Sequence, residues 1–376
     1  MKRIALVEPN HSHEEVLFPL IELLRGVCEV HVVAPQSLLD VDLLRDTRHM
    51  YQAVPYVPAL PKSRIGRRLG VGRRYAAIRK AIDRIGPDLV LFNSVPSRVD
   101  ELCVAWFFRS HSKIRVIHNF QNCLSPLGRL LYSAFDGNLV ISEQVHRYVA
   151  AHHPHFGKLG YVLPIFFGGF RDAAAVRPSV RKPADGGLKL GVFGSIEQER
   201  RNYRGLLDAL SHWSGRADGA NFHVHLVGKA PAWLQAEIQR NDLQKIVTLY
   251  ERFVPFREMF DLFDGMDLVL FLIDGSVANA GHYNRYKISG TSTLMKAFPK
   301  AGASSTDFIL DDALKPRCYF YEGQNVQGLL EQIARGEITG ETIRAKLEAT
   351  ASVPEYSFQR QQAMLMEMIE KAMGSP

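Results

Sequence analysis

The sequence contains few cysteines, no long hydrophobic run and no internal repeat. Its 376 residues include four cysteines, which are far apart and show no CxxC spacing. That spacing argues against a disulfide scaffold or a zinc knuckle and is typical of a protein from a reducing cytoplasm. No stretch approaches the roughly 18 uninterrupted apolar residues that a membrane-spanning helix needs. Glu8 and Pro9 interrupt the apolar N-terminus before a signal-peptide core can form.

Several catalytic signatures are also missing. The sequence contains no HExxH or Cys/His zinc spacing, no GxSxG motif and no P-loop, and we expect no bound metal. Hydrophobic residues make up 46% of the chain and charged residues 23%, which excludes a disordered or fibrous protein. At about 150 residues per domain, the length predicts two domains.

The positive charge of the chain is concentrated in one segment. Lysine and arginine total 46 against 39 aspartates and glutamates, which gives a net charge of +7. Residues 62–84 carry nine of the basic side chains and one acidic one, so the rest of the chain has a net charge of −1. This concentration indicates one anionic surface contact and argues against nucleic-acid binding over a whole face.

The apolar residues of this basic segment fall at helical spacing, although Gly70 and Gly72 are expected to break the helix. We expect the segment to lie on an anionic membrane surface as an amphipathic basic element. The alternatives are a flexible loop that binds a phosphorylated substrate and a merely solvated face. The residues expected to contact the membrane or the acceptor are Arg64, Arg67, Arg68, Arg73 and Arg74.

Short runs of valine, isoleucine and leucine alternate with longer segments of helical periodicity, which is the pattern of βαβ units around a parallel sheet. The expected strands are 3–7, 28–33, 88–92, 114–117 and 138–141 in the first half, and 188–193, 222–227, 246–249 and 267–272 in the second. Residues 164–187, rich in proline and glycine, are the expected linker. We predict an α/β protein in which two Rossmann-like domains, 1–168 and 169–352, face each other across a cleft. Residues 353–376 follow, and 355–373 are expected to form an amphipathic helix.

The loop after the first strand holds the candidate catalytic residues. Folds of this class bind ligands beyond the carboxyl ends of their strands. Ser12 and Glu15 have the spacing of a capping box, so Ser12 is expected to cap the next helix. His11, His13 and Glu14 have no such structural role, and any of them could act as a general base on an acceptor hydroxyl. The alternative is a solvated polar helix start.

Two segments of the second half suit phosphate binding. Gly194 and Ser195 follow a strand and precede Arg201 and Asn202 at the start of a helix. Glycine lets a ligand approach the backbone, and arginine binds phosphate oxygens in a fork. Residues 275–306 contain no aspartate or glutamate. Within them, basic and small hydroxyl residues lead into another helix and would form a phosphate cradle: Lys287, Ser289, Gly290, Thr291, Ser292 and Thr293. The alternative is an ordinary hydroxyl-rich helix cap.

The chain resembles the GT-B glycosyltransferases over nearly its whole length, and most clearly in the second half. GVFGSIEQERRNYRGLLDAL has the shape of the family's glycine turn and following helix, with Arg201-Asn202 where Lys-Asn is usual. FHVHLVGKAP is similar to the next strand, ERFVPFREMFDLFDGMDLVLFLI to the base-binding loop and its helix, and YKISGTSTLMKAFPKAGASS to the donor-phosphate helix. YSFQRQQAMLMEMI is similar to the terminal helix that crosses back onto the first domain.

The resemblance implies that the second domain binds the donor and the first domain the acceptor. Phe253 and Val254 would lie at the nucleotide base, while Arg201, Lys287 and the N–H groups of 289–293 would stabilise the leaving diphosphate in place of a metal. The retaining group usually has two glutamates with seven residues between them, and this chain lacks the pair, so retaining and inverting chemistry both stay open. An inverting enzyme would need a base such as His11, His13 or Glu14.

We therefore expect a metal-independent glycosyltransferase that moves a sugar from a nucleotide-diphosphate donor to a glycan or lipid-linked acceptor. The resemblance points to bacterial cell-surface polysaccharide or glycolipid synthesis, in the cytoplasm and peripheral on the inner face of the cell membrane. No cofactor beyond the nucleotide-sugar co-substrate and no nucleic-acid partner is expected. The alternatives are a nucleotide-sugar epimerase or hydrolase of the same fold and a catalytically silent scaffold subunit.

Overall fold

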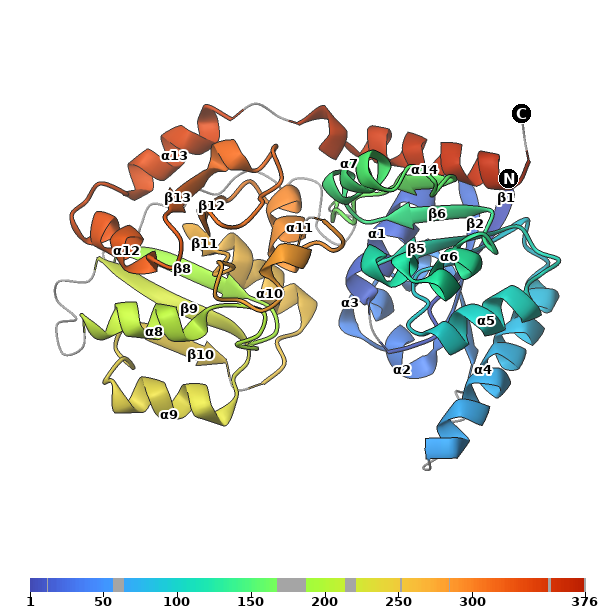
Figure 1. Ribbon diagram of the computed structural model, residues 1–376, viewed down its shortest axis with the longest axis horizontal. Coiled ribbons are helices and arrows are strands. Elements are labelled where there is room, and N and C mark those ends of the chain that lie inside the picture. Colours follow the sequence, from blue (N-terminus) through green and yellow to red (C-terminus); the bar gives the residue numbers. More distant parts are fainter. Residues whose placement is uncertain are drawn as a thin grey trace. The chain divides into compact units, whose positions relative to one another are not determined.

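The computed structural model describes the whole chain except Ser12, residues 57–63, 168–186, 214–220, Glu251, Asn284, 351–352 and 375–376, and the side chains of 64–69. The chain divides into two compact units (Figure 1). The first unit comprises Met1–Ala175, Arg285–Ile288 and Pro354–Pro376, and the second comprises Val176–Asn284 and Ser289–Val353. The segment Arg285–Ile288 therefore packs with the first unit, although the sequence placed it in the second domain. Most of the expected linker lies outside the described residues.

The first unit is built on a parallel sheet of seven strands in the order β3-β2-β1-β4-β5-β6-β7. The strands are β1 (Lys2–Val7), β2 (Cys28–Pro35), β3 (Gln52–Tyr56), β4 (Leu89–Phe92), β5 (Lys113–Ile117), β6 (Gly137–Val140) and β7 (Leu159–Tyr161). The helices are α1 (Glu14–Leu24), α2 (Gln36–Leu39), α3 (Asp42–Arg45), α4 (Arg64–Ile85), α5 (Arg98–Phe107), α6 (Pro126–Tyr132), α7 (Glu143–His152) and α14 (Phe358–Ala372).

The second unit is built on a parallel sheet of six strands in the order β10-β9-β8-β11-β12-β13. The strands are β8 (Leu188–Phe193), β9 (Phe222–Lys229), β10 (Val247–Tyr250), β11 (Leu268–Leu270), β12 (Ala301–Ser305) and β13 (Cys318–Tyr321). The helices are α8 (Tyr203–Ser211), α9 (Ala232–Arg240), α10 (Phe256–Asp264), α11 (Gly290–Ala297), α12 (Val326–Ala334) and α13 (Gly340–Glu348). The α/β class and the strands expected from the sequence are thus confirmed, with strand ends shifted by a few residues.

Burial of apolar strand residues stabilises both sheets. In the first unit, Val7 and Phe92 of neighbouring strands are fully buried, as are Ile78 and Ile82 of α4, which packs over them. A strand that is buried on both faces has a nearly continuous apolar sequence, and most of the strands could therefore be predicted from the sequence.

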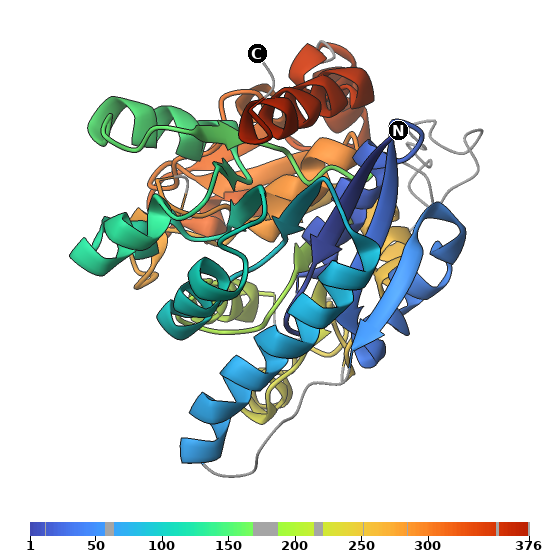
Figure 2. The same cartoon turned by 90° about the vertical axis from the view of Figure 1, so that its right-hand side faces the viewer.

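Helix α4, the long light-blue helix of Figure 2, runs without a break from Arg64 to Ile85. The expectation that Gly70 and Gly72 break the helix is therefore wrong. A glycine in the interior of a helix destabilises it by about 1 kcal/mol relative to alanine. Burying Tyr75, Ile78 and Ile82 completely in the core contributes more, at about 1.5–3 kcal/mol for each large apolar side chain.

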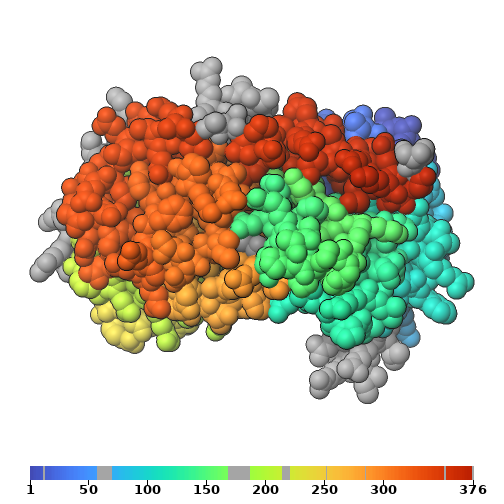
Figure 3. Space-filling view, turned by 45° about the horizontal axis from the view of Figure 1, so that its top comes forward, coloured from blue at the N-terminus to red at the C-terminus, as the bar shows by residue number. Residues whose placement is uncertain are grey.

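The C-terminal helix α14 packs on the first unit, and its atoms are dark red in the space-filling view of Figure 3. Leu365 and Ile369 are fully buried. Gln361 accepts a hydrogen bond from the Leu163 N–H at 2.8 Å, and Gln362 donates one to the Leu23 carbonyl at 2.8 Å. Because these contacts join the end of the chain to α1 and to the segment after β7, α14 is part of the core of this unit.

Each sheet has one point where the strand order reverses direction. In the first sheet it lies between β1 and β4, and in the second between β8 and β11. Loops leave such neighbouring parallel strands toward opposite faces, which opens a crevice at the carboxyl ends of the strands. Among the described residues, no helix is both long enough and apolar enough to cross a bilayer.

Candidate functional site

A buried carboxyl group lies where β1 and β4 of the first unit end. Glu8 follows β1 directly and is fully buried. Its carboxyl accepts hydrogen bonds from the backbone N–H of Asn10 at 2.9 Å, the Ser94 hydroxyl at 2.6 Å and the Asn93 side-chain amide at 2.8 Å. Burial raises the pKa of the Glu8 carboxyl to about 7, even though the hydrogen bonds from Ser94, Asn10 and Asn93 oppose the rise. This carboxyl therefore joins the loops that follow β1 and β4.

Asn93 extends the connection to two histidines. Its side-chain amide also donates to the His13 carbonyl at 3.0 Å, and its own carbonyl lies 2.7 Å from His118 Nε2. A carbonyl only accepts, so His118 Nε2 must carry the proton in this contact. The rings of His13 and His118 stack with their centroids 3.9 Å apart. Three strand ends, those of β1, β4 and β5, thus bring Glu8 and two imidazoles together.

The two imidazoles have opposite electrostatic environments. Burial, reinforced by repulsion from His13, lowers the pKa of His118 to about 4, so this ring is neutral at pH 7. Burial alone would lower the pKa of His13 too, but its hydrogen bond and charge contact with Glu15 raise it. His13 Nδ1 lies 3.1 Å from a Glu15 carboxylate oxygen. With Nδ1–H donating to that oxygen, Nε2 of His13 is the nitrogen that can take a proton.

The helix start differs from the capping box that the sequence predicted. The N-cap of α1 is His13, with φ of 67° and no side-chain cap hydrogen bond, and Ser12 lies outside the described residues. Glu15 points to the His13 ring, so its role is to hold an imidazole. The left-handed conformation is unusual for a residue with a side chain, and such strain concentrates at functional sites.

The three predicted catalytic residues do not share one environment. His13 is part of the cluster, whereas His11 Nδ1 lies 2.6 Å from the Ser37 hydroxyl at the start of α2. Glu14 lies in the first turn of α1, where burial raises its pKa. The sequence analysis missed Glu8 as a site residue because it treated this residue only as an interruption of an apolar run. It missed Asn93 and His118 too, although each directly follows an expected strand, and that position was the available signal.

The crevice of the second unit contains a buried arginine. Arg201 is 7% exposed, and its guanidinium donates to the Ser195 carbonyl at 3.1 Å and to the Thr291 hydroxyl at 3.4 Å. Its Nε has no hydrogen-bond partner among the described residues. Gly194, with φ of 108°, brings the turn after β8 so close that an added Cβ would lie 3.2 Å from this guanidinium. The glycine turn, the arginine and the start of α11 therefore form one cluster.

Helix α11 provides hydrogen-bond donors beside this arginine. Its N-cap Ser289 makes no side-chain cap hydrogen bond. Ser292 Oγ is buried with no partner among the described residues. The first N–H groups of a helix have no partner within the helix. Unpaired buried polar groups are costly, so a site that leaves several of them around a cation suits an anionic ligand.

Other predicted donor residues have different surroundings. Asn202 caps α8 by accepting from the Gly205 N–H at 2.9 Å and donates to Asp274 at 2.8 Å, so its side chain is engaged within the protein. Lys287 belongs to the segment that packs with the first unit. In the loop before α10, Phe253 is 67% exposed, whereas Val254 is buried. A contact of Phe253 with a nucleotide base stays a prediction.

The basic segment is only partly the exposed surface that was expected. Arg74 turns inward, where it forms an ion pair with Asp100 and donates to the Asn10 side chain at 3.1 Å. The expectation that Arg74 contacts a membrane is therefore wrong, because the buried Asp100 carboxylate needs a cationic partner. Arg73 is exposed. The side chains of Arg64, Arg67 and Arg68 lie outside the described part of the structure.

Comparison with known proteins identifies the fold. No family model and no curated relative matches the sequence. Among solved structures, a glycosyltransferase from Rickettsia africae is 12% identical with a TM-score of 0.67, covering 100% of this chain and 99% of its own. HepE from Anabaena in complex with UDP is 14% identical with a TM-score of 0.62, covering 98% and 100%. A putative UDP-N-acetylglucosamine 2-epimerase from Listeria monocytogenes is 11% identical with a TM-score of 0.63, covering 100% and 97%.

The chain therefore has the GT-B fold, with two parallel α/β units and a C-terminal helix that returns to the first. Both glycosyltransferases and 2-epimerases are among the proteins similar to it. At such low identity the likeness shows the fold and leaves the reaction to be argued from the site.

Proposed function

We propose that the protein is a glycosyltransferase that transfers a sugar from a nucleotide-diphosphate donor to a glycan or lipid-linked acceptor in bacterial cell-surface polysaccharide or glycolipid synthesis. The observation that carries the proposal is the cluster of unpaired donors in the second unit. The Arg201 Nε and Ser292 Oγ atoms are buried without partners among the described residues, next to the N-terminus of α11. Diphosphate oxygens would satisfy these groups.

In this proposal, the second unit stabilises the leaving diphosphate. Negative charge grows on the diphosphate as the sugar bond breaks, and Arg201 with the N–H groups of α11 would stabilise that charge without a metal. The absence of aspartate and glutamate from 275–306 keeps this region free of charges that would repel phosphate. HepE, similar to this chain over its whole length, was crystallised with UDP, which makes uridine nucleotides the first donors to test.

The first unit would provide acid–base chemistry. In an inverting enzyme, His13 Nε2 would take the proton from the acceptor hydroxyl while Glu15 stabilises the imidazolium that forms. His118, neutral at pH 7 and stacked on His13, would hold the ring in place. His11 and Glu14 would then position the acceptor. We propose that the enzyme acts in the cytoplasm at the inner face of the cell membrane.

A nucleotide-sugar epimerase is the second candidate. It is favoured by the likeness to the Listeria protein and by the number of titratable groups around Glu8. The two candidates differ in their products. A glycosyltransferase releases the nucleoside diphosphate and lengthens an acceptor, whereas an epimerase inverts one sugar carbon and releases no nucleotide.

The first test is thermal unfolding with UDP, GDP, dTDP, ADP and CMP, each with and without Mg²⁺. A nucleotide at 100 times its Kd should stabilise the protein by about 2.7 kcal/mol. We expect one nucleoside diphosphate to give this shift without Mg²⁺, and Arg201→Ala to abolish it. Arg240→Ala, which removes an exposed arginine on α9, is the matched control and should keep the shift. No shift with any nucleotide would refute the donor site and favour a silent scaffold.

A further inference from the structure

Helix α5 has an unusual distribution of polar and apolar residues. Val99, Leu102 and Trp106 are 41%, 49% and 70% exposed. They lie three and four residues apart, so they form one stripe along the outer face of the helix. Val104, on the opposite face, is fully buried in the core of the first unit. The helix is therefore apolar on both faces, although one of them is exposed.

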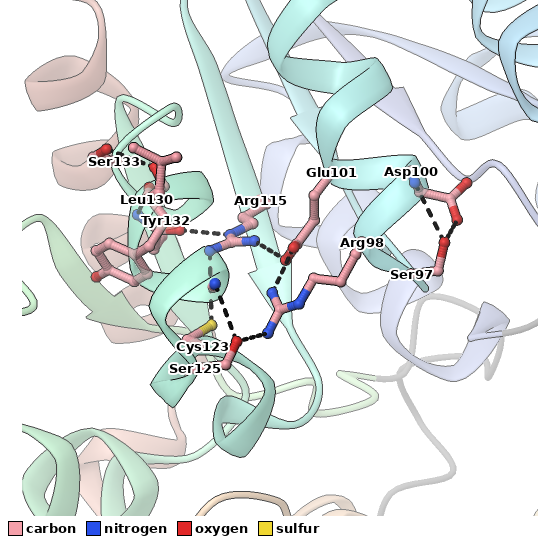
Figure 4. A network of polar contacts seen from close by, with 12 residues as sticks. Ser97, Arg98, Asp100, Glu101, Arg115, Cys123, Ser125, Leu130, Tyr132 and Ser133 are labelled. Atoms are coloured by element: carbon pink, nitrogen blue, oxygen red, sulfur yellow. Dashed lines mark hydrogen bonds and ion pairs between the residues drawn. The ribbon is translucent and has the colours of Figure 1, made fainter.

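The acidic residues of α5 are buried instead of exposed. Asp100 pairs with Arg74, and the Ser97 hydroxyl also contacts its carboxylate. Glu101 lies between two arginines, with one oxygen 2.5 Å from Arg115 and the other 2.5 Å from Arg98. Figure 4 shows Glu101 between these two guanidinium groups. Burying a carboxylate is costly and needs paired cations. The outer face of α5 thereby loses both of its negative charges.

The neighbouring helix α6 also exposes apolar side chains. Arg98 on α5 donates to Ser125, the N-cap of α6, at 2.9 Å, and this contact joins the two helices (Figure 4). Leu127 and Leu130 of α6 are 43% and 68% exposed, again three residues apart. We call the five residues of this surface the α5–α6 face: Val99, Leu102, Trp106, Leu127 and Leu130.

The exposed charges on α5 and α6 and just beyond α5 have one sign. Within α5 and α6, which the structure describes completely, no acidic side chain is exposed. Arg129 is exposed on α6, and the exposed Arg109 lies just beyond α5, with its guanidinium carbon 5.7 Å from the centre of the Trp106 ring. Helix α4, which packs against α5, adds the exposed Arg73 and Lys80, and its exposed Asp83 is paired with Arg79. A large exposed apolar surface with a cationic rim is complementary to an anionic lipid surface.

We propose that the α5–α6 face inserts its apolar side chains into a bilayer of anionic phospholipid, with the surrounding arginines on the lipid phosphates. Tryptophan is suited to this interface because its ring is apolar at one end and donates a hydrogen bond at the other. Sequence analysis considered only the basic residues 62–84, and the structure adds the apolar surface that would enter the lipid. This membrane contact would hold the first unit where lipid-linked acceptors are found, and for that role the inference rests on the proposed function.

The environment of Trp106 provides a direct test. The chain has three tryptophans, and Trp213 and Trp233 pack against the core of the second unit. In the full chain with Trp213→Phe and Trp233→Phe, Trp106 is the remaining tryptophan and can be excited selectively over tyrosine. With vesicles of equal parts phosphatidylglycerol and phosphatidylcholine, we expect its emission to shift to shorter wavelength and to be quenched by brominated acyl chains. Binding with unchanged emission would place another face on the lipid and overturn the proposal.

A matched pair of variants tests the apolar contribution. Leu102→Ser/Trp106→Ser should weaken vesicle binding by about tenfold or more, because binding scales with the apolar area buried. Ile309→Ser/Phe320→Ser, which changes two exposed apolar residues in the second unit, should leave binding unchanged. Circular dichroism checks that both variants fold. Equal affinities for the two variants, or no binding by the unchanged protein, would refute the proposal.

Two further measurements distinguish the remaining outcomes. A blue shift that appears without vesicles and grows with protein concentration would identify a second copy as the occupant and overturn the lipid proposal. The nucleotide thermal shift, measured on the same samples without lipid, tests the donor site alone. If the protein binds vesicles but shows no nucleotide thermal shift, the proposed function is refuted. If it shows the nucleotide thermal shift but does not bind vesicles, the lipid proposal is refuted.

Discussion

The buried Glu8 carboxyl makes a strong prediction about the pH dependence of stability. Its pKa rises from 4.5 to about 7 on folding because the group is buried. Between these values the folded protein keeps a proton that the unfolded chain has lost. Stability must therefore fall as pH rises from 4.5 through about 7. A shift of this size corresponds to about 3 kcal/mol, lost by the time the carboxyl is fully ionised.

Glu8→Gln removes this titration while keeping the size and shape of the side chain. We expect the free energy of unfolding to fall by about 3 kcal/mol more in the unchanged protein than in Glu8→Gln between about pH 5 and about pH 8. The variant also loses a hydrogen bond at both pH values, at about 1 kcal/mol, because an amide nitrogen cannot accept from its neighbours. The comparison across pH cancels that constant cost.

Urea unfolding at the two pH values measures the difference. Glu348→Gln, an exposed glutamate at the end of α13, is the control and should show the pH dependence of the unchanged protein. If Glu8→Gln and the unchanged protein lose stability in parallel between the two pH values, the carboxyl does not carry a raised pKa. The cluster around Asn93 and His118 would then need another explanation.

Further predictions concern the histidine pair, a close backbone approach, and the C-terminal helix. Glu15→Gln removes the carboxylate that raises the pKa of His13, so the low-pH limb of the kcat/KM profile should move to lower pH; an unmoved limb would mean that His13 is not the base. Gly228→Ala would place a Cβ 2.2 Å from a backbone carbonyl oxygen and should cost about 1–3 kcal/mol or more in urea unfolding. Gly72→Ala, with nothing within 4 Å of the new Cβ on a helix, should instead stabilise by up to about 1 kcal/mol, and equal effects of the two substitutions would contradict this reasoning. Leu365→Ala opens a cavity between α14 and the first sheet and should cost about 2–5 kcal/mol, whereas a smaller loss would mean that α14 contributes little to this unit.

Two of the four strands that the sequence did not predict, β12 and β3, depend on their neighbours in the sheet. β12 has the sequence AGASS, whose small residues carry little apolar signal, yet all five are buried because neighbouring strands cover them. β3 contains Pro55 and lies at the edge of its sheet, where a missing N–H is tolerated. Both strands exist because of their neighbours, which a pattern along the chain does not contain. The same holds for α4, where tertiary burial of Tyr75 and Ile78 outweighs the two glycines.

Apolar periodicity along the chain was sufficient to predict the fold class, the order of the main elements and the terminal helix, because it reflects which face of each element is buried. The sequence also identified the glycine turn at Gly194 and the acid-free segment that leads into α11. The contacts between distant polar residues depend on the packing of the strands. Glu8, Asn93 and His118 come together because parallel strands end at the same edge of a sheet, and their spacing of 85 and 25 residues leaves no local pattern. Packing also produced the exposed apolar stripe on α5, because it buried Asp100 and Glu101 and left Val99, Leu102 and Trp106 exposed.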